Sequence, residues 1–287
     1  MKIAFCIPGI VGSLQGKYGI GQTIDPRIGH YFHKKHIFNN NDVDVFIHSW
    51  SVNFQNMLID LYDPKKYIFE KQIDFKQNSL RNNSIKSRWY STKKVVELKR
   101  QYEIENNFEY DCVMLYRFDH VFLRDICLNE FNMDYFYVSH TNMHGLRDID
   151  CNCTSLSMVT DCWLFSNSKN IDIFSQIYDT WKEDGSLNPH LSTKNKMREI
   201  VGNDRIKQVL YPRQDNECAR ALYEDCWYKF GQFNINNLKR YDFDYYPIER
   251  FPGCGKTTPR MPIKEKQQLC FDNLPPFWIK TNKGAQD

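Results

Sequence analysis

The sequence predicts an α/β fold with a mostly parallel central sheet flanked by helices. Short apolar runs typical of buried strands alternate with helical patterns through the first half of the chain, as they do in parallel α/β sheets. The clearest run, residues 112–116 (CVMLY), is apolar throughout, which fits a strand buried on both faces. Right-handed crossovers put the ends of parallel strands at one edge, where such sheets bind ligands. Polar residues that follow the strands are therefore the candidate site.

Composition narrows the class of protein. The chain has 287 residues, of which 41% are hydrophobic, enough for one large domain or for a domain with an appendage. A net charge of +3 is too small to indicate a polyanion partner. The chain has no apolar run long enough to span a bilayer, and its first residues lack a signal-peptide cleavage site. We therefore expect a cytoplasmic protein without a transmembrane segment, whose ten cysteines are reduced thiols.

Six runs are predicted to be strands, because each is short, largely apolar and bounded by polar or turn-forming residues. In chain order they are residues 2–8, 43–50, 67–75, 112–116, 135–139 and 158–166. The first ends at Pro8 and Gly9, and the glycines that follow do not have the GxGxxG spacing of a dinucleotide site. The second ends in His48 and Trp50, and the fifth ends at His140. Polar and aromatic groups therefore follow several of the strands.

Helices are predicted where apolar residues recur at helical spacing behind a capping residue. In chain order they are residues 26–38, 54–61, 91–106, 170–184, a basic helix ending near residue 200, and residues 214–228. The first carries Arg27 and a face rich in histidine and lysine, which we expect to be solvated. Ser91 is the predicted N-cap of the third helix, and the polar residues 76–87 before it are a candidate mobile loop. His190 falls in a linker bounded by glycine and proline.

Charged residues in or after the apolar runs are the candidates for chemistry. Arg117 and Asp119 directly follow the run at 112–116, and they form either a surface salt bridge or part of a ligand site. Asp161 is a lone carboxylate in an apolar run, and burying it unpaired would cost several kcal/mol, so we expect a partner or a polar cleft. His48 is either a hydrogen-bonded structural imidazole or a ligand contact.

Two apparent motifs are rejected. The cysteines at 151, 153 and 162 lack the paired CxxC spacing of a structural zinc site. Residues 253–258 (GCGKTT) look like the end of a phosphate-binding loop, but Arg250 stands where its first glycine is required, and Pro259 stands where a helix should begin.

Several blocks, in this order, give the chain a family resemblance. They are VDVFIHSW, LYDPKKYIFE, SRWYSTKKVVEL, FEYDCVMLYRFDHVF and VTDCWLFSNS. Together they resemble a group of viral and bacterial glycosyltransferases with the GT-A fold, over about residues 1–200. The resemblance implies a GT-A-like catalytic domain over residues 1–250. Residues 251–287 are then a basic extension containing Pro and Gly, with six Lys or Arg against three acids.

The resemblance also implies a metal site. GT-A enzymes usually carry Asp-x-Asp after a central strand, where a carboxylate and Mn²⁺ or Mg²⁺ hold the donor diphosphate. In this chain Arg117 replaces the first aspartate, so Asp119 is the implied metal ligand and His190 a weaker second one. Arg117 could itself neutralise the diphosphate, which puts strict metal dependence in question.

The implied reaction is transfer of a sugar from a nucleoside diphosphate, with UDP favoured, to an acceptor hydroxyl. Asp161 is the predicted base of an inverting mechanism. The predicted donor-binding residues are Pro8, Gly9, Arg27, His48, Trp50, Arg117 and Asp119, and those on the acceptor side are His140 and Asp148. A glycan is the first choice of acceptor. A hydroxymethylated base in DNA is the alternative, with the basic extension as the DNA contact. A sugar- or nucleotide-binding module without catalysis is the alternative of another class.

Overall fold

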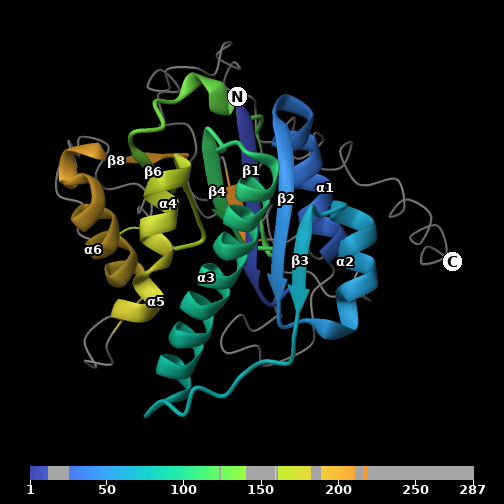
Figure 1. Ribbon diagram of the computed structural model, residues 1–287, viewed down its shortest axis with the longest axis vertical. Helices are drawn as coiled ribbons and strands as arrows, with labels where there is room; N and C mark the ends of the chain where they lie inside the picture. The colour runs from blue at the N-terminus through green and yellow to red at the C-terminus, as the bar shows by residue number, and fades with distance from the viewer. Residues whose placement is uncertain are drawn as a thin grey trace, which may run out of the picture.

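The computed structural model describes residues 1–11, 26–122, 124–139, 159, 161–181, 189–210 and 216–218. Its centre is a seven-stranded sheet in the order β3-β2-β1-β4-β7-β6-β8, flanked by helices (Figure 1). The strands are β1 (Lys2–Gly9), β2 (Asp42–Ser49), β3 (Lys66–Phe69), β4 (Cys112–Tyr116), β6 (Phe136–Ser139), β7 (Trp163–Ser166) and β8 (Ile206–Val209). The predicted α/β class with a mostly parallel sheet is confirmed.

One strand of this sheet runs against the others. β7 is antiparallel to both its neighbours, β4 and β6, whereas the remaining pairs are parallel. Tyr116 at the end of β4 pairs with Trp163 at the start of β7. The edge at which β1, β2 and β4 end is therefore also the edge at which β7 begins, and a residue just before β7 reaches the same place as one just after β4.

Helices cover both faces of the sheet because its central strands bury side chains in both directions. They are α1 (Pro26–His36), α2 (Gln55–Tyr62), α3 (Leu80–Asn106), α4 (Ser168–Ser175), α5 (Ile177–Thr180) and α6 (Pro189–Val201). On β1, Phe5 packs in the core that includes Leu58 of α2, whereas Cys6 packs in the core that includes Val96 of α3. Alternation along a strand thus supplies two cores. In Figure 1 the strands β2 and β3 point downward and α3 runs back up across the sheet.

The smaller elements show that one predicted helix is wrong in part. β5 (His120–Phe122) pairs antiparallel with β9 (Asn216–Cys218), so the helix predicted over residues 214–228 is wrong at 216–218. The extension predicted over residues 251–287 lies outside the described residues. Short 3₁₀ helices lie at Phe38–Asn40, Val52–Phe54, Leu128–Glu130 and Asn203–Arg205.

The long helix α3 begins eleven residues earlier than the sequence predicted. The backbone N–H of Asn82 donates to Ser79 Oγ at 3.1 Å, which makes Ser79 the N-cap. Most of the loop expected at residues 76–87 is therefore helix, and Ser91 is a buried residue in its interior. Packing of Ile85 and Trp89 into the core outweighs the polar composition of these first turns.

Other differences concern where elements end and on which element two of the site residues lie. The strand expected to reach residue 75 ends at Phe69, and the helix expected over residues 170–184 is divided at Gln176. Asp161 lies before β7 rather than inside it, and His190 lies in the first turn of α6 rather than in a linker.

The histidine face of α1 is not solvated as expected. His33 has no exposed surface, and its Nε2–H donates to the carbonyl oxygen of His120 at 2.7 Å. Burial lowers the pKa of His33 to about 3, so the imidazole is neutral at ordinary pH.

Two further observations concern the described residues as a whole. Cys6, Cys112, Cys127 and Cys162 are free thiols, and none of the described helices has the length and apolar character needed to cross a membrane.

Candidate functional site

A small depression lies where β4 ends and β7 begins. It is lined by Pro8 of β1, Arg88 of α3, Arg117 and Asp161, among other residues. It is shallow and partly open to solvent, and its cavity volume of about 10 Å³ has room for roughly one water molecule. We call this feature the strand-edge depression. It lies at the edge where α/β sheets bind ligands, and it brings together charges from segments distant in the sequence.

Asp161 is the buried carboxylate of this depression. Its Oδ2 lies 2.7 Å from Arg88 Nη1, its backbone carbonyl accepts a hydrogen bond from Arg88 Nη2, and its Oδ1 lies 3.3 Å from His190 Nδ1. The side chain of Asp161 is 8% exposed, whereas Arg88 is 26% and His190 33% exposed. The expected partner for this carboxylate is therefore present. We call Arg88, Arg117, Asp161 and His190 the edge cluster.

The electrostatics of the edge cluster keep Asp161 ionised. Burial, the largest single influence, raises the pKa of this carboxyl, but Arg88, His190 and Arg117 together outweigh it. The net result is a pKa below the ordinary value, so the carboxylate form is present throughout the neutral range.

Asp119 lies beside the depression rather than in its lining. Arg117 Nε donates to Asp119 Oδ1 at 2.8 Å and Nη2 donates to Oδ2 at 2.5 Å, which is a bidentate pair. The carboxylate is 4% exposed. The turn that carries it packs against α1, because a Cβ added to Gly29 would lie 2.1 Å from the carbonyl oxygen of Phe118. The first turn of α1, with Arg27, therefore lies near residues 117–119.

His48 and Trp50 form a separate, buried group. His48 Nε2–H donates to Glu70 Oε1 at 2.9 Å, and its Nδ1 lies 2.7 Å from Ser91 Oγ. Burial lowers the pKa of His48, against the opposing effect of the Glu70 hydrogen bond. The Trp50 ring stacks on Tyr90, with 5.4 Å between centroids. These contacts tie β2 to α3, and neither His48 nor Trp50 is part of the depression's lining.

Of the remaining predicted site residues, one lines the depression, one lies in a turn next to it, and two are not described. Pro8 lines the depression, and the carbonyl of Gly9 accepts a hydrogen bond from the backbone N–H of Trp50 at 3.2 Å. Gly9 has φ +100°, a conformation that favours glycine at this turn. His140 and Asp148 lie outside the described residues.

The described residues do not assemble the implied metal site. Both oxygens of Asp119 accept from Arg117, and His190 lies against Asp161 instead. Within the described ranges no group of three or more His, Cys, Asp or Glu side chains could hold a metal ion. Mg²⁺ is commonly held by one or two carboxylates together with substrate phosphates, so Asp119 could be a ligand only by sharing its oxygens with Arg117.

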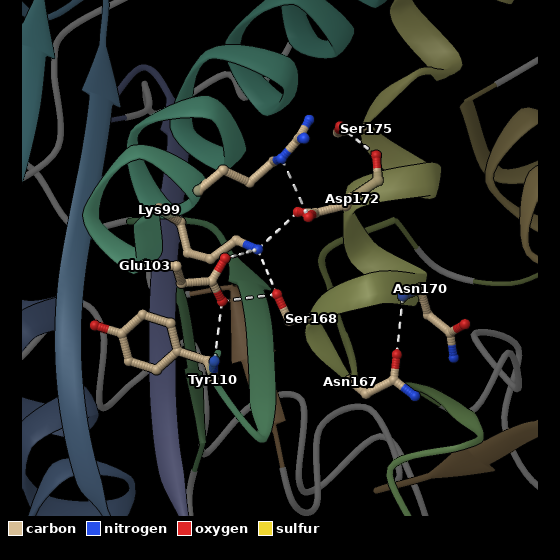
Figure 2. Close-up of polar contacts among 9 residues, drawn as sticks. Lys99, Glu103, Tyr110, Asn167, Ser168, Asn170, Asp172 and Ser175 are labelled. Atoms are coloured by element: carbon tan, nitrogen blue, oxygen red, sulfur yellow. Dashed lines mark hydrogen bonds and ion pairs between the residues drawn. The ribbon is translucent and has the colours of Figure 1, made fainter. Parts of the chain in front are cut away.

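A second buried charge cluster lies beside Tyr110, just before the start of β4 and thus at the end of this strand away from Arg117 (Figure 2). We call Lys99, Glu103, Ser168 and Asp172 the inner cluster. Lys99 Nζ donates to Glu103 Oε2 at 2.9 Å, to Ser168 Oγ at 2.5 Å and to Asp172 Oδ1 at 2.7 Å. Glu103 Oε1 accepts from Ser168 Oγ and from the backbone N–H of Tyr110. All three ammonium protons of Lys99 can be used, and its side chain has no exposed surface, so this lysine is closed to solvent, whereas Asp172 is 24% exposed.

Sequence reasoning missed Arg88. This residue stands in the SRWYSTKKVVEL block, in a segment interpreted partly as loop, and its partner Asp161 is 73 residues away. The sequence did contain a signal. Arg88 is a charged residue next to Trp89 and one turn after Ile85, on a helix face that is otherwise buried, and a charge in such a place calls for a partner.

Comparisons with known proteins give one structural similarity. No family model matches the chain, and no curated protein matches it. Among solved structures, the chain is similar to the apo form of the glycosyltransferase GlyE of Streptococcus pneumoniae, with a TM-score of 0.39 and 13% sequence identity. The similarity covers 99% of this chain and 62% of that one, so the chain spans less than two thirds of that protein's length. The function proposed below rests on the chain's own residues.

Proposed function

We propose that this protein is a nucleotide-sugar-dependent glycosyltransferase whose reaction takes place at the strand-edge depression. The observation that carries the proposal is the edge cluster itself. A buried, ionised Asp161 lies between Arg88 and His190, and Arg117 lines the same depression. Arg88, Arg117 and Asp161 belong to three of the blocks on which the family resemblance rests. Residues that are distant in the sequence thus meet at one ligand-binding edge.

In the proposed reaction, an acceptor hydroxyl oxygen forms a bond to the anomeric carbon of the donor sugar. The bond from that carbon to the diphosphate oxygen breaks, and its electron pair leaves with the nucleoside diphosphate. The acceptor proton passes to Asp161, which its lowered pKa keeps in the required carboxylate form. The same ion pair with Arg88 makes Asp161 a weaker base than a free carboxylate, so charge stabilisation of the leaving group carries more of the rate.

The proposal includes a UDP-sugar donor, inversion at the anomeric carbon and a glycan acceptor. Asp119 supports the site through its bidentate pair with Arg117, and Arg27 lies near that turn. The donor role for His48 and Trp50 is weaker, because their contacts join β2 to α3. The DNA alternative depends on residues 251–287, which lie outside the described residues.

A screen of nucleotide sugars tests the proposal. Thermal unfolding of the full chain is measured with each nucleotide sugar and each nucleoside diphosphate, with and without Mn²⁺. Ligands that stabilise the chain are then tested for nucleotide release, with and without simple saccharide acceptors. We expect one nucleotide family to raise the melting temperature and its sugar to be turned over. Stabilisation without any turnover would support the binding-module alternative, and no stabilisation by any ligand would contradict the proposal.

A further inference from the structure

We propose that Arg88 and Arg117 together hold the diphosphate of a nucleotide at the mouth of the strand-edge depression without a divalent metal ion. The inference deepens the proposed function and rests on it for the identity of the nucleotide. Arg88 comes from α3 and Arg117 from the residue after β4, and both line the depression. Each guanidinium side chain is 26% exposed. Two guanidinium groups, each already paired with a carboxylate, therefore stand at the place where a leaving group needs neutralisation.

Each arginine is paired with a carboxylate that holds its guanidinium group in place. Arg88 pairs with Asp161, and Arg117 binds both oxygens of Asp119. Such anchoring holds a guanidinium in one orientation before the ligand arrives, which lowers the entropy lost on binding. A planar, weakly hydrated guanidinium is also well matched to phosphate oxygens.

Arg88 retains hydrogen-bonding capacity. Its Nη1 and Nη2 contact Asp161, whereas its Nε is buried and has no hydrogen-bond partner among the described residues. An unsatisfied buried N–H is costly unless something occupies it, and a charged donor more so. A phosphate oxygen would satisfy this group once the atoms that cover it move aside on binding.

The carboxylates that would be metal ligands are already used. Both oxygens of Asp119 accept from Arg117, and the two oxygens of Asp161 lie against Arg88 and His190. A divalent ion at either carboxylate would compete with a guanidinium for the same oxygens. The arginine pair and a metal are therefore alternatives at this place, and the contacts favour the pair.

Isothermal titration with pyrophosphate and with UDP, in EDTA and in Mn²⁺, tests the inference. For the unaltered chain we expect equal binding in both conditions. We expect Asp161→Asn to bind as tightly or more tightly, because Arg88 loses a competing anion. We expect the double variant Arg88→Gln with Asp161→Asn to bind about tenfold more weakly or worse. The double variant leaves no buried charge unpaired, and circular dichroism checks that it folds.

Arg100→Gln is the matched control, because it removes an arginine from the same helix away from the depression. Its side chain is 55% exposed and lies 3.3 Å from Asp172, so we expect unchanged pyrophosphate affinity. Binding that requires Mn²⁺, or a double variant that binds like the unaltered chain, would overturn the arginine pair. The first of these outcomes would leave the glycosyltransferase proposal standing. Pyrophosphate binding in EDTA without turnover of any nucleotide sugar would overturn the proposed function and leave the arginine pair. Absence of all binding would overturn both.

Discussion

The inner cluster and the edge cluster both include residues of α3, yet they differ in exposure and in hydrogen bonding. Lys99 has no exposed surface, and its donors end on Glu103, Ser168 and Asp172. Arg88 is partly exposed beside a depression, and its Nε has no partner within the part of the chain that the structure describes. Both clusters pair their charges, so pairing alone does not mark a functional site. Access to solvent and unused hydrogen-bonding capacity distinguish the two.

Removing the inner charge should have the largest effect on stability. We expect Lys99→Met to lower the free energy of unfolding by about 3 to 5 kcal/mol, because Glu103 would remain buried without its counter-charge. Urea denaturation measures the change. Arg100→Gln, which removes an exposed partner of Asp172, should cost only about 0 to 1 kcal/mol. Similar losses in the two variants would show that Lys99 is not closed to solvent.

Removing the edge carboxylate should affect chemistry more than folding. We expect Asp161→Asn to lower the rate of sugar transfer about a hundredfold or more, since the proton acceptor is lost. Its stability should fall less than that of Lys99→Met, because the partly exposed Arg88 can be hydrated. Turnover and urea denaturation of the same preparations give both quantities. Full turnover by a folded Asp161→Asn would remove this residue as the base.

Removing the N-cap of α3 should affect the part of the helix near Arg88 and leave the part near Lys99 unchanged. We expect Ser79→Ala to cost about 1 kcal/mol, because it removes the acceptor for the backbone N–H of Asn82. Hydrogen exchange should speed up in the first turns of α3, which lead to Arg88, and stay slow around Lys99. Ser84→Ala, a change inside the same helix, is the matched control with little expected effect. Faster exchange along the whole helix would contradict independent behaviour.

The smallest expected difference between the clusters is the direction in which the stability contributions of Asp161 and Asp172 change with pH. The pKa of Asp161 is lowered in the folded chain, so its contribution to stability is present above its ordinary value of 3.8 and is lost as the pH falls below it. The pKa of Asp172 is raised, chiefly by burial and against Lys99, so its contribution is full below 3.8 and is lost as the pH rises through the raised value.

Urea denaturation from about pH 3 to about pH 6 measures this difference. The stability of the unaltered chain minus that of Asp161→Asn should increase as the pH rises. The corresponding difference for Asp172→Asn should decrease. Curves of the same sign would contradict the contrast between the two clusters.

The sequence predicted the parts of the fold that depend on local pattern. The run at 112–116 was identified because a strand buried on both faces is continuously apolar, and that pattern survives in any sheet of this kind. The direction of β7 was not predictable, because a buried strand reads the same in either orientation. The first turns of α3 were missed because Ser79 and core packing, not composition, specify them.

The candidate site was predicted in part for a similar reason. The cost of burying a lone carboxylate predicted that Asp161 would have a partner. The identity of Arg88 as that partner depends on how α3 crosses the sheet, which no local pattern specifies. His48 was left with two interpretations, and its contacts with Glu70 and Ser91 support the structural one. The donor, acceptor and metal roles stay predictions.

The reversed strand β7 also affects how this protein can change over evolution. Because β6 and β7 are antiparallel neighbours, the chain departs after Ser139 and re-enters at Trp163 along one side of the sheet. The pairing of Val138 with Leu164 places no requirement on how many residues intervene. His140 and Asp148 both fall in that interval. If His140 and Asp148 have the acceptor-side roles that the sequence predicts, a descendant could change residues 140–158 and adopt a new acceptor while keeping Asp161 and the sheet.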